Sequence, residues 1–387
     1  MARRSVVAQT SQLIPLHAAR ARSALHKRIL AWFDQHARDL PWRRNRNAYR
    51  IWVSEVMLQQ TQVAAVVPYF ERFLRAFPTL LDLAGAEEQE VLRLWEGLGY
   101  YRRAHDLHRA ARRLRDEHGG RVPDDPALLE KLPGFGPYTR NAVLSQAFDT
   151  RLPILEANSR RVLTRLFGVT TDPRRKSTEG LLWRKAEDLL PPRRVGDFNQ
   201  AIMELGSLVC TPIRPRCSEC PAAPWCVARR EGIQNRIPPP ARRADAVAVS
   251  EMAVVVRKGP CVLLVQRPAN GRWAGLWEFP HGPREPGEIA QESATRLLRT
   301  LTGLTAQIGG ELITLRHGVT RFRITMVCMD ARFASGRFRS PVYKRGRWVR
   351  PVALADYPVS APQRRLTQIV AQSTPQQRLL RKRAKPP

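Results

Sequence analysis

Four cysteines lie close together in the second half of this chain. They are Cys210, Cys217, Cys220 and Cys226, separated by six, two and five residues, and the chain has only six cysteines in all. Thiolates this close in sequence can converge on one inorganic centre, and four of them match the coordination of a [4Fe-4S] cluster. Zinc is the alternative, but four-thiolate zinc sites usually combine two Cys-x-x-Cys pairs, and only one occurs here. The spacing therefore favours the iron–sulfur cluster.

A short segment with two glycines, Leu132–Thr139, is a candidate phosphate site. Gly134 and Gly136 alternate with other residues, which allows a tight turn whose backbone N–H groups point outward. A helix beginning directly afterwards would add positive potential, so the turn could hold a phosphate. Such a turn contacts the backbone of DNA and does not read its sequence. An ordinary turn between helices is the alternative.

A carboxylate lies beside an apolar stripe in the segment Trp52–Val63. We expect this segment to open an amphipathic helix, with Glu55 near the first turn and Met57 and Val63 facing inward. A carboxylate at that position could simply complement the helix dipole. A buried carboxyl group with a raised pKa would instead suit a general acid.

The composition indicates a polyanionic partner. The 387 residues include 65 Lys and Arg against 34 Asp and Glu, a formal net charge of +31. Such a field attracts nucleic acid, although a basic chain without that function is the alternative. No apolar run approaches the length of a membrane span, and metal-ligating cysteines indicate a reducing compartment. We expect a monomeric, cytoplasmic, nucleoid-associated protein of a bacterium.

The pattern of residues predicts a multidomain chain. Helical periodicity with proline punctuation ends after the cysteines, and short β-branched runs follow a Pro/Arg-rich stretch. The expected divisions are a basic arm over 1–22, a helical region over 23–230 with the cluster loop at 210–226, a linker over 231–248, an α/β domain over 249–358 and a solvated basic tail over 359–387. A transit peptide is the alternative for the arm.

Taken together, these motifs resemble the helix-hairpin-helix, iron–sulfur DNA glycosylases, and specifically their adenine-specific, MutY-type branch. The resemblance covers nearly the whole chain and includes Leu40-Pro41-Trp42, the Glu55 segment and Gly97-Leu98-Gly99-Tyr100-Tyr101. It implies an all-α catalytic region. It also implies that Glu55 is the general acid that protonates N7 of adenine, which makes the base a leaving group.

The same resemblance implies roles for residues after the hairpin. Bifunctional relatives have a Schiff-base lysine where this chain has Tyr138, so strand cleavage through an imine is not expected. The family pattern Pro-Ile-Leu-Asp-Gly-Asn is here Pro-Ile-Leu-Glu156-Ala157-Asn158. Either Glu156 replaces the aspartate that stabilises positive charge on the sugar, which we favour, or catalysis is impaired. Asn158 matches the asparagine that orients the carboxylate.

Further residues are matched to DNA or base contacts by the resemblance alone. Those near the base stack are Gln60, Tyr100 and Tyr101, and those near the adenine pocket are Arg38, Leu40, Trp42, Arg43 and Gln200. For each of these residues, ordinary packing is the alternative.

The C-terminal domain resembles a Nudix fold that has lost its metal site. Leu297, Thr300 and Leu301 occupy positions where the hydrolases carry glutamates, so magnesium and nucleotide hydrolysis are not expected. The family's Phe-Ser-His loop, which recognises oxidised guanine, aligns with Val319-Thr320-Arg321. Thr320 and Arg321 keep hydrogen-bonding groups there.

The resulting hypothesis is a monofunctional adenine DNA glycosylase of base-excision repair. Its partner is double-stranded DNA in which adenine is mispaired with 8-oxoguanine or guanine, and its cofactor is a [4Fe-4S] cluster. One alternative is a related glycosylase with another base preference, such as mismatched thymine. The other is a DNA-binding iron–sulfur protein whose catalysis is weakened at Glu156.

Overall fold

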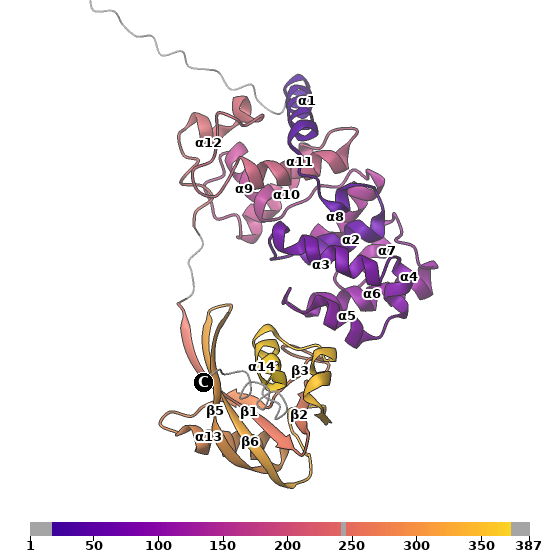
Figure 1. Ribbon diagram of the computed structural model, residues 1–387. Helices are drawn as coiled ribbons and strands as arrows, with labels where there is room; N and C mark the ends of the chain where they lie inside the picture. The colour runs from indigo at the N-terminus through magenta and orange to yellow at the C-terminus, as the bar shows by residue number, and fades with distance from the viewer. Residues whose placement is uncertain (1–17, 241–244, 373–387) are drawn as a thin grey trace, which may run out of the picture. The chain divides into compact units, whose positions relative to one another are not determined.

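A computed structural model of the chain describes residues 18–240 and 245–372 (Figure 1). The chain forms two compact units. The first comprises residues up to 70 together with 113–242, and the second comprises 71–112 together with residues from 243 onward. The chain passes between the units within two helices, α3 (Val63–Ala76) and α6 (Arg102–His118).

The first unit is helical. Besides parts of α3 and α6, it contains α1 (Ala19–His36), η1 (Pro41–Arg43), α2 (Ala48–Leu58), α7 (Pro126–Glu130), α8 (Pro137–Phe148), α9 (Ala157–Leu166), α10 (Lys176–Asp188), α11 (Val195–Leu208), η2 (Ala223–Trp225) and α12 (Val227–Arg230). None of the helices in the described parts of the chain is long and apolar enough to cross a membrane.

Apolar residues at helical spacing form the core of this unit. Leu25, Ile29 and Phe33 recur every four residues along α1, so they share one face of that helix. This face packs with residues of α9, α10 and α11 that include Leu182 and Leu205. Burial of such side chains stabilises the fold by about 1.5–3 kcal/mol each.

Helix α2 differs from the expectation in its start. It begins at Ala48, where the Asn47 side chain accepts a hydrogen bond from the Arg50 N–H, and it ends at Leu58. Our expectation of a helix that opens near Trp52 was therefore wrong. The N-cap asparagine supplies the start signal, and Glu55 consequently lies in the last turn.

The hairpin between two helices is confirmed. Helix α7 ends at Glu130, and α8 begins at Pro137 with Gly136 at its N-cap. Gly134 has a φ of 81°, a left-handed conformation that favours glycine. Proline at the first helical position needs no N–H partner there, so sequence and local structure agree.

The second unit combines helices with a seven-stranded mixed sheet. Its helices are the remainder of α3 and α6 with α4 (Leu80–Gly85), α5 (Glu88–Trp95), α13 (Ala290–Thr302), η3 (Pro351–Asp356) and α14 (Ala361–Gln372). Its strands are β1 (Val247–Lys258), β2 (Cys261–Gln266), β3 (Trp277–Glu278), β4 (His281–Pro283), β5 (Leu304–Val319), β6 (Phe322–Gly336) and β7 (Arg345–Val349).

The sheet has the order β3-β2-β1-β6-β5, with β4 paired to β1 and β7 paired to β2. β1 and β6 are parallel, whereas β1 and β2 form an antiparallel hairpin, with Lys258 opposite Cys261. Because β-strand side chains alternate between faces, β1 contributes to two cores. Val254 packs with the α13 residue Leu298, and Val255 packs with the α14 residue Leu366.

Helix α14 corrects the expectation of a solvated tail from residue 359. Leu366 and Val370 are fully buried, because they lie four residues apart on the face of α14 that covers the sheet. The basic residues beside them concealed this pattern in the sequence. The expected tail beyond Gln372 and most of the expected N-terminal arm lie outside the described residues.

Candidate active site

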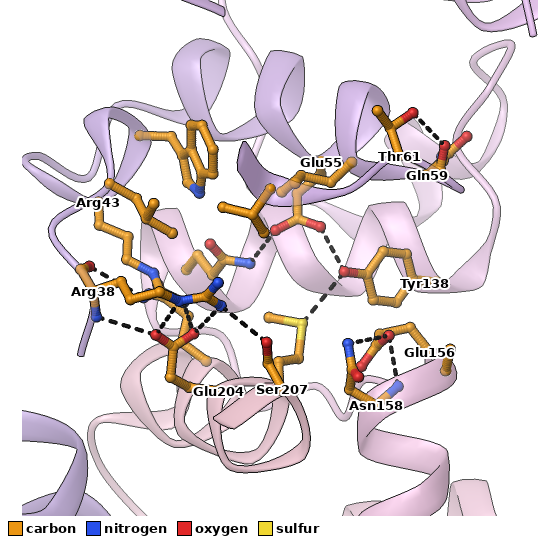
Figure 2. Close-up of a pocket in the computed structure, with 18 of the residues that line it drawn as sticks. Arg38, Arg43, Glu55, Gln59, Thr61, Tyr138, Glu156, Asn158, Glu204 and Ser207 are labelled. Atoms are coloured by element: carbon orange, nitrogen blue, oxygen red, sulfur yellow. Dashed lines mark hydrogen bonds and ion pairs between the residues drawn. The ribbon is translucent and has the colours of Figure 1, made fainter. Parts of the chain in front are cut away.

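A cavity of about 500 Å³ in the first unit brings together most of the residues predicted to act in catalysis or to contact DNA or the base (Figure 2). Its volume lies in the range of small-molecule pockets. It is lined by Arg38, Leu40, Trp42, Arg43, Glu55, Leu58, Gln59, Gln60, Thr61, Val63, Tyr138, Gln146, Glu156, Ala157, Asn158, Gln200, Met203, Glu204 and Ser207. Ten of these were expected to act in catalysis, to line the adenine pocket or, for Gln60, to lie near the base stack: Arg38, Leu40, Trp42, Arg43, Glu55, Gln60, Tyr138, Glu156, Asn158 and Gln200.

Glu55 is buried in this cavity, with only 3% of its surface exposed. The Tyr138 hydroxyl donates to Oε2 at 2.6 Å, and the Gln146 side-chain amide donates to Oε1 at 2.7 Å. Burial raises the pKa of the Glu55 carboxyl above its ordinary value, and the two donors oppose that rise without cancelling it. Glu55 is therefore better able than an exposed carboxyl group to carry a proton.

The position of Glu55 in α2 also favours the protonated form of its carboxyl group. It lies three residues before the end of the helix at Leu58, where the helix dipole disfavours a negative charge. The alternative interpretation, a charge that complements the start of a helix, is therefore wrong.

Tyr138 is held beside Glu55 at the start of α8. Its hydroxyl also lies 3.4 Å from the sulfur of Met203. Burial raises the pKa of Tyr138 well above its usual value, and the charges of Glu55 and Glu156 add to this rise. Tyr138 therefore remains a neutral hydrogen-bond donor at physiological pH.

Glu156 lies at the N-cap of α9, and its carboxylate caps that helix. Oε1 accepts from the Ser159 N–H at 2.7 Å, and Oε2 accepts from the Asn158 N–H at 2.8 Å. The Asn158 side-chain amide also donates to Oε2 at 3.3 Å. The carboxylate is thus oriented by its own helix and by the residue that was expected to orient it (Figure 2).

Asn158 is also held in place by its contact with α11. A Cβ atom added to Gly206 would lie 2.7 Å from the Asn158 Cβ, so only glycine permits this close packing. The Arg161 Nη2 donates to Asn158 Oδ1 at 2.8 Å and to the Gly206 carbonyl at 2.7 Å. Arg161 Nε also donates to the Cys210 carbonyl at 2.7 Å. One side chain therefore joins the cavity to the cysteine segment.

Arg38 and Arg43 also line the cavity, and both form ion pairs with the buried carboxylate of Glu204. Glu204 accepts from Arg38 Nε at 2.7 Å and from Arg43 Nη2 at 3.0 Å. Burial alone would raise the pKa of Glu204, but the hydrogen bonds from Arg38 and Arg43 outweigh it and hold the pKa at about 2. Both arginines therefore serve first to neutralise Glu204.

Three important cavity residues were not found from the sequence. Gln146, Met203 and Glu204 lie on α8 and α11, far in sequence from the residues that they contact. The sequence contained only a weak indication of these three residues. Glu204 is a charged residue within a largely apolar helix, and a fully buried charge requires a partner.

The remaining predicted contacts lie outside this cavity. Gly134 and Gly136 are exposed in the hairpin before α8. In the second unit, Tyr100 is 52% exposed, whereas Tyr101 is 5% exposed and donates from its hydroxyl to the Val359 carbonyl. A buried Tyr101 does not present its ring to a ligand in this conformation.

The expected recognition loop is a tight turn in the same unit. Thr320 and Arg321 are exposed between β5 and β6, and Thr320 has a φ of 53°. The Thr320 hydroxyl donates to the Val319 carbonyl, and the Arg321 guanidinium lies 5.4 Å from the centre of the Phe322 ring. The side chains expected to contact a base are thus accessible.

The four clustered cysteines line a common cavity after α11. All four are free thiols, and burial raises the pKa of the Cys220 thiol to about 12. Among the described residues, no three His, Cys, Asp or Glu side chains form a site for a single metal ion. In a [4Fe-4S] cluster each thiolate binds its own iron, so four thiols around one cavity fit that group.

Arg165 holds the start of the cysteine segment. It is only 2% exposed. It donates to the carbonyls of Thr211, Pro212 and Ile237, at 2.6, 3.1 and 2.9 Å, and its Nη1 lies 3.3 Å from the Cys210 sulfur. This guanidinium can donate a hydrogen bond to the Cys210 sulfur while that sulfur binds a metal.

Comparison with known families gives the class of the protein. Residues 53–188 match the HhH-GPD superfamily of base excision DNA repair proteins, and residues 251–368 match the NUDIX domain. The hairpin and buried carboxyl lie in the first region, and the mixed sheet lies in the second. The chain thus combines a base-excision-repair region of the HhH-GPD superfamily with a C-terminal Nudix-like domain.

Similarity to named proteins identifies the family to which the chain belongs. The adenine DNA glycosylase of Mus musculus is 38% identical over 81% of this chain and 72% of its own length, and that of Rattus norvegicus is 39% identical over 70% and 63%. The chain belongs to the adenine DNA glycosylase family, although it spans less than two thirds of the rat protein. A solved thermostable thymine-DNA glycosylase is 29% identical over 54% of this chain and 97% of its own, with a TM-score of 0.49.

The Glu204 contacts predict a stability effect. Glu204→Gln leaves Arg38 and Arg43 without their shared charge, so we expect the free energy of unfolding to fall by about 3 kcal/mol, as when one partner of a buried pair is removed. Glu179→Gln is the matched control, because the Arg160–Glu179 pair is partly exposed and is worth about 0–1 kcal/mol. Denaturant unfolding measures both values. Equal losses would contradict the role assigned to Glu204.

Proposed function

We propose that this protein hydrolyses the N-glycosidic bond of adenine mispaired with 8-oxoguanine or guanine in double-stranded DNA. The observation that carries this proposal is the buried Glu55 carboxyl, hydrogen-bonded to Tyr138 and Gln146 in a base-sized cavity. Family membership supports adenine as the base that is released. The product would be free adenine and an abasic site, as the first step of base-excision repair.

Glu55 is the proposed general acid. Adenine must leave the base stack to enter the cavity. The Glu55 carboxyl then donates its proton to N7, the bond between the base and the sugar breaks, and its electron pair goes to the base. The raised pKa of Glu55 makes the protonated form available nearer to neutral pH. Tyr138 and Gln146 hold the carboxyl in position throughout.

Glu156 is the proposed stabiliser of the positive charge that develops on the sugar. Its carboxylate lies on the same cavity as Glu55 and raises the pKa of Glu55 through their repulsion. An acid that keeps its proton and a carboxylate that keeps its charge are the pair that glycoside hydrolysis requires. Water then adds to the sugar and completes the hydrolysis.

We further propose that the enzyme does not cleave the DNA strand. A Schiff base with the sugar requires an unprotonated amine in the reaction cavity. The cavity is lined by arginines, but no lysine is among its lining residues within the described chain, and Tyr138 cannot form an imine. Purified protein is expected to leave abasic sites that break only on treatment with alkali.

Two surfaces are proposed for the remaining contacts with DNA. The exposed Gly134 and Gly136 precede the N-terminus of α8, where outward N–H groups can bind a backbone phosphate. The exposed Thr320 and Arg321 can donate hydrogen bonds to the base opposite adenine. Preference for 8-oxoguanine over guanine would depend on these two donors.

We propose that Cys210, Cys217, Cys220 and Cys226 hold a [4Fe-4S] cluster. The donor set is four thiols around one cavity, with Arg165 beside the first sulfur. Bound to these thiolates, the cluster would supply cross-links that fix the segment after α11. A reducing compartment such as the bacterial cytoplasm would preserve the free thiols.

The central test is Glu55→Gln. The amide cannot donate a proton at the rate of a carboxylic acid, so we expect adenine release from an A:8-oxoguanine duplex to slow by at least about 100-fold. Single-turnover cleavage after alkali treatment measures the rate, and circular dichroism checks the fold. Release at the unmodified rate would contradict the proposed mechanism.

Companion variants and duplexes separate the alternatives. Glu179→Gln removes a partly exposed carboxylate that is not among the residues lining the cavity, and it serves as the control. Glu156→Gln should also slow release, and an unchanged rate would remove Glu156 from the mechanism.

Duplexes with A:G and T:G test base preference, because faster release of thymine would favour the alternative glycosylase. Binding without any base release would favour a non-catalytic protein.

Tyr138→Phe predicts a shift in pH dependence. A general acid works only while protonated, so the rate should fall as pH rises through the pKa of Glu55. The Tyr138 hydrogen bond lowers that pKa, so its removal should raise the pKa and move the falling limb of the single-turnover profile to higher pH. Tyr357→Phe, which alters a partly buried tyrosine of the second unit, should leave the limb in place. A shift to lower pH would contradict the assignment.

The cluster predicts a metal content. We expect about four iron and four sulfide ions per chain in protein purified without oxygen, with a broad absorption band in the visible range. The Cys220→Ala variant should lose most of the iron and the sulfide. The Cys261→Ser variant, changed at the start of β2, should retain them. One equivalent of zinc without sulfide would favour the alternative metal centre.

A further inference from the structure

The loop of residues 96–101, which joins α5 to α6, has an unusual backbone. Gly97, Gly99 and Tyr100 all have positive φ, at 100°, 69° and 46°. A tyrosine rarely adopts this conformation, so the surrounding contacts must hold it. The result is an aromatic ring that is 52% exposed at the tip of the loop. We call residues 96–101 the Tyr100 loop.

Arg103 supports this loop from α6. Its Nη2 donates to the carbonyls of Leu98 and Gly99, both at 3.2 Å. Its guanidinium lies 5.3 Å from the Trp95 ring and 5.6 Å from the Tyr100 ring, within the range of cation–π contacts. Burial lowers the pKa of Arg103 to about 10, so it remains charged at neutral pH.

Residues of the C-terminal segment hold the other side of the loop within the same unit. Arg364 of α14 makes two hydrogen bonds to the Glu96 carboxylate, at 2.6 and 2.7 Å. The Val359 N–H donates to the same carboxylate at 3.3 Å, and the Tyr101 hydroxyl donates to the Val359 carbonyl at 3.1 Å. We call Glu96, Tyr101, Val359 and Arg364 the loop clamp.

Two of the clamp residues, Val359 and Arg364, belong to the framework of the Nudix-like domain. Val359 is fully buried and forms a parallel bridge with Trp277 of β3. Arg364 lies on α14, which covers one face of the sheet through Leu366. The bidentate arginine pair fixes direction as well as distance. The loop therefore rests on the sheet through short, directional contacts.

We propose that the Nudix-like domain positions Tyr100 for extrusion of the target base. This inference rests on the proposed function, since it gives the exposed ring a place in the opened base stack. A held ring loses little conformational entropy when it enters DNA. The C-terminal domain thereby contributes to opening of the duplex at adenine, in addition to contact with the opposite base. Glu96, Tyr101 and Arg364 are positioning residues.

The test measures extrusion in proteins that also carry Glu55→Gln, because an intact Glu55 could release the reporter base. The fluorescent analogue 2-aminopurine replaces the target adenine opposite 8-oxoguanine, and its emission rises when the base leaves the stack. The protein with only Glu55→Gln should give a full rise at saturation. We expect the extruded-to-stacked ratio to fall about ten-fold in Arg364→Met and about three-fold in Tyr101→Phe, as for loss of charged and neutral hydrogen bonds. The duplex dissociation constant should change by less than the ratio does.

Matched variants separate positioning from general damage. Arg257→Met breaks a 2.7 Å ion pair with Asp330 elsewhere in the same domain and should leave the fluorescence unchanged. Arg364→Lys should restore part of the rise, since it keeps one charged donor. If Arg364→Met does not fold, Tyr101→Phe removes a single hydroxyl and still decides the matter.

The possible results distinguish this inference from the proposed function. A full rise in both Arg364→Met and Tyr101→Phe would overturn the positioning role of the loop clamp. Adenine release by the wild type would leave the proposed function intact in that case. Failure of the protein with only Glu55→Gln to extrude the base, together with failure of the wild type to release adenine, would overturn the proposed function, and this inference with it. A reduced rise in both variants, with adenine release intact in the wild type, supports the clamp.

Discussion

The proposed chemistry depends on one balance of forces at Glu55. Burial makes the charged carboxylate costly, while the hydrogen bonds from Tyr138 and Gln146 make it less costly. With more donors the group would ionise and lose its proton, and with none it would be an unsatisfied polar group in the core. The two donors are both on α8, one near its N-terminus and one near its C-terminus. The packing of α8 against α2 therefore determines the acidity of the site.

The second carboxylate depends on a different set of contacts. Glu156 is oriented by the N-terminus of α9 and by Asn158, and Arg161 fixes Asn158 to Gly206 and to the Cys210 carbonyl. Movement of the cysteine segment would therefore move the guanidinium of Arg161, and with it the amide that contacts Glu156. A cluster that holds Cys210 in place would stabilise this geometry without any redox step. This argument gives the proposed cofactor a role in positioning.

Local patterns were sufficient to predict the hairpin before α8 and the change from helices to strands after the cysteines, because turn residues and apolar spacing act over a few residues. They were also sufficient to select Glu55 and the residues of the same cavity, through their resemblance to a family. They failed where the decisive contact is distant in sequence. Gln146, Glu204 and the buried face of α14 are defined by partners on other elements, which no local spacing reveals.

In the proposed mechanism, Glu156 stabilises the positive charge on the sugar. Its extra methylene moves the carboxylate relative to an aspartate, yet both oxygens still accept backbone hydrogen bonds from α9. A covalent bond to the sugar would require attack from a narrowly defined distance, whereas electrostatic attraction falls off gradually as the separation grows. A carboxylate already occupied in capping a helix is poorly placed to act as a nucleophile, whereas electrostatic attraction needs no such close approach. The geometry of Glu156 therefore favours electrostatic stabilisation over a covalent intermediate.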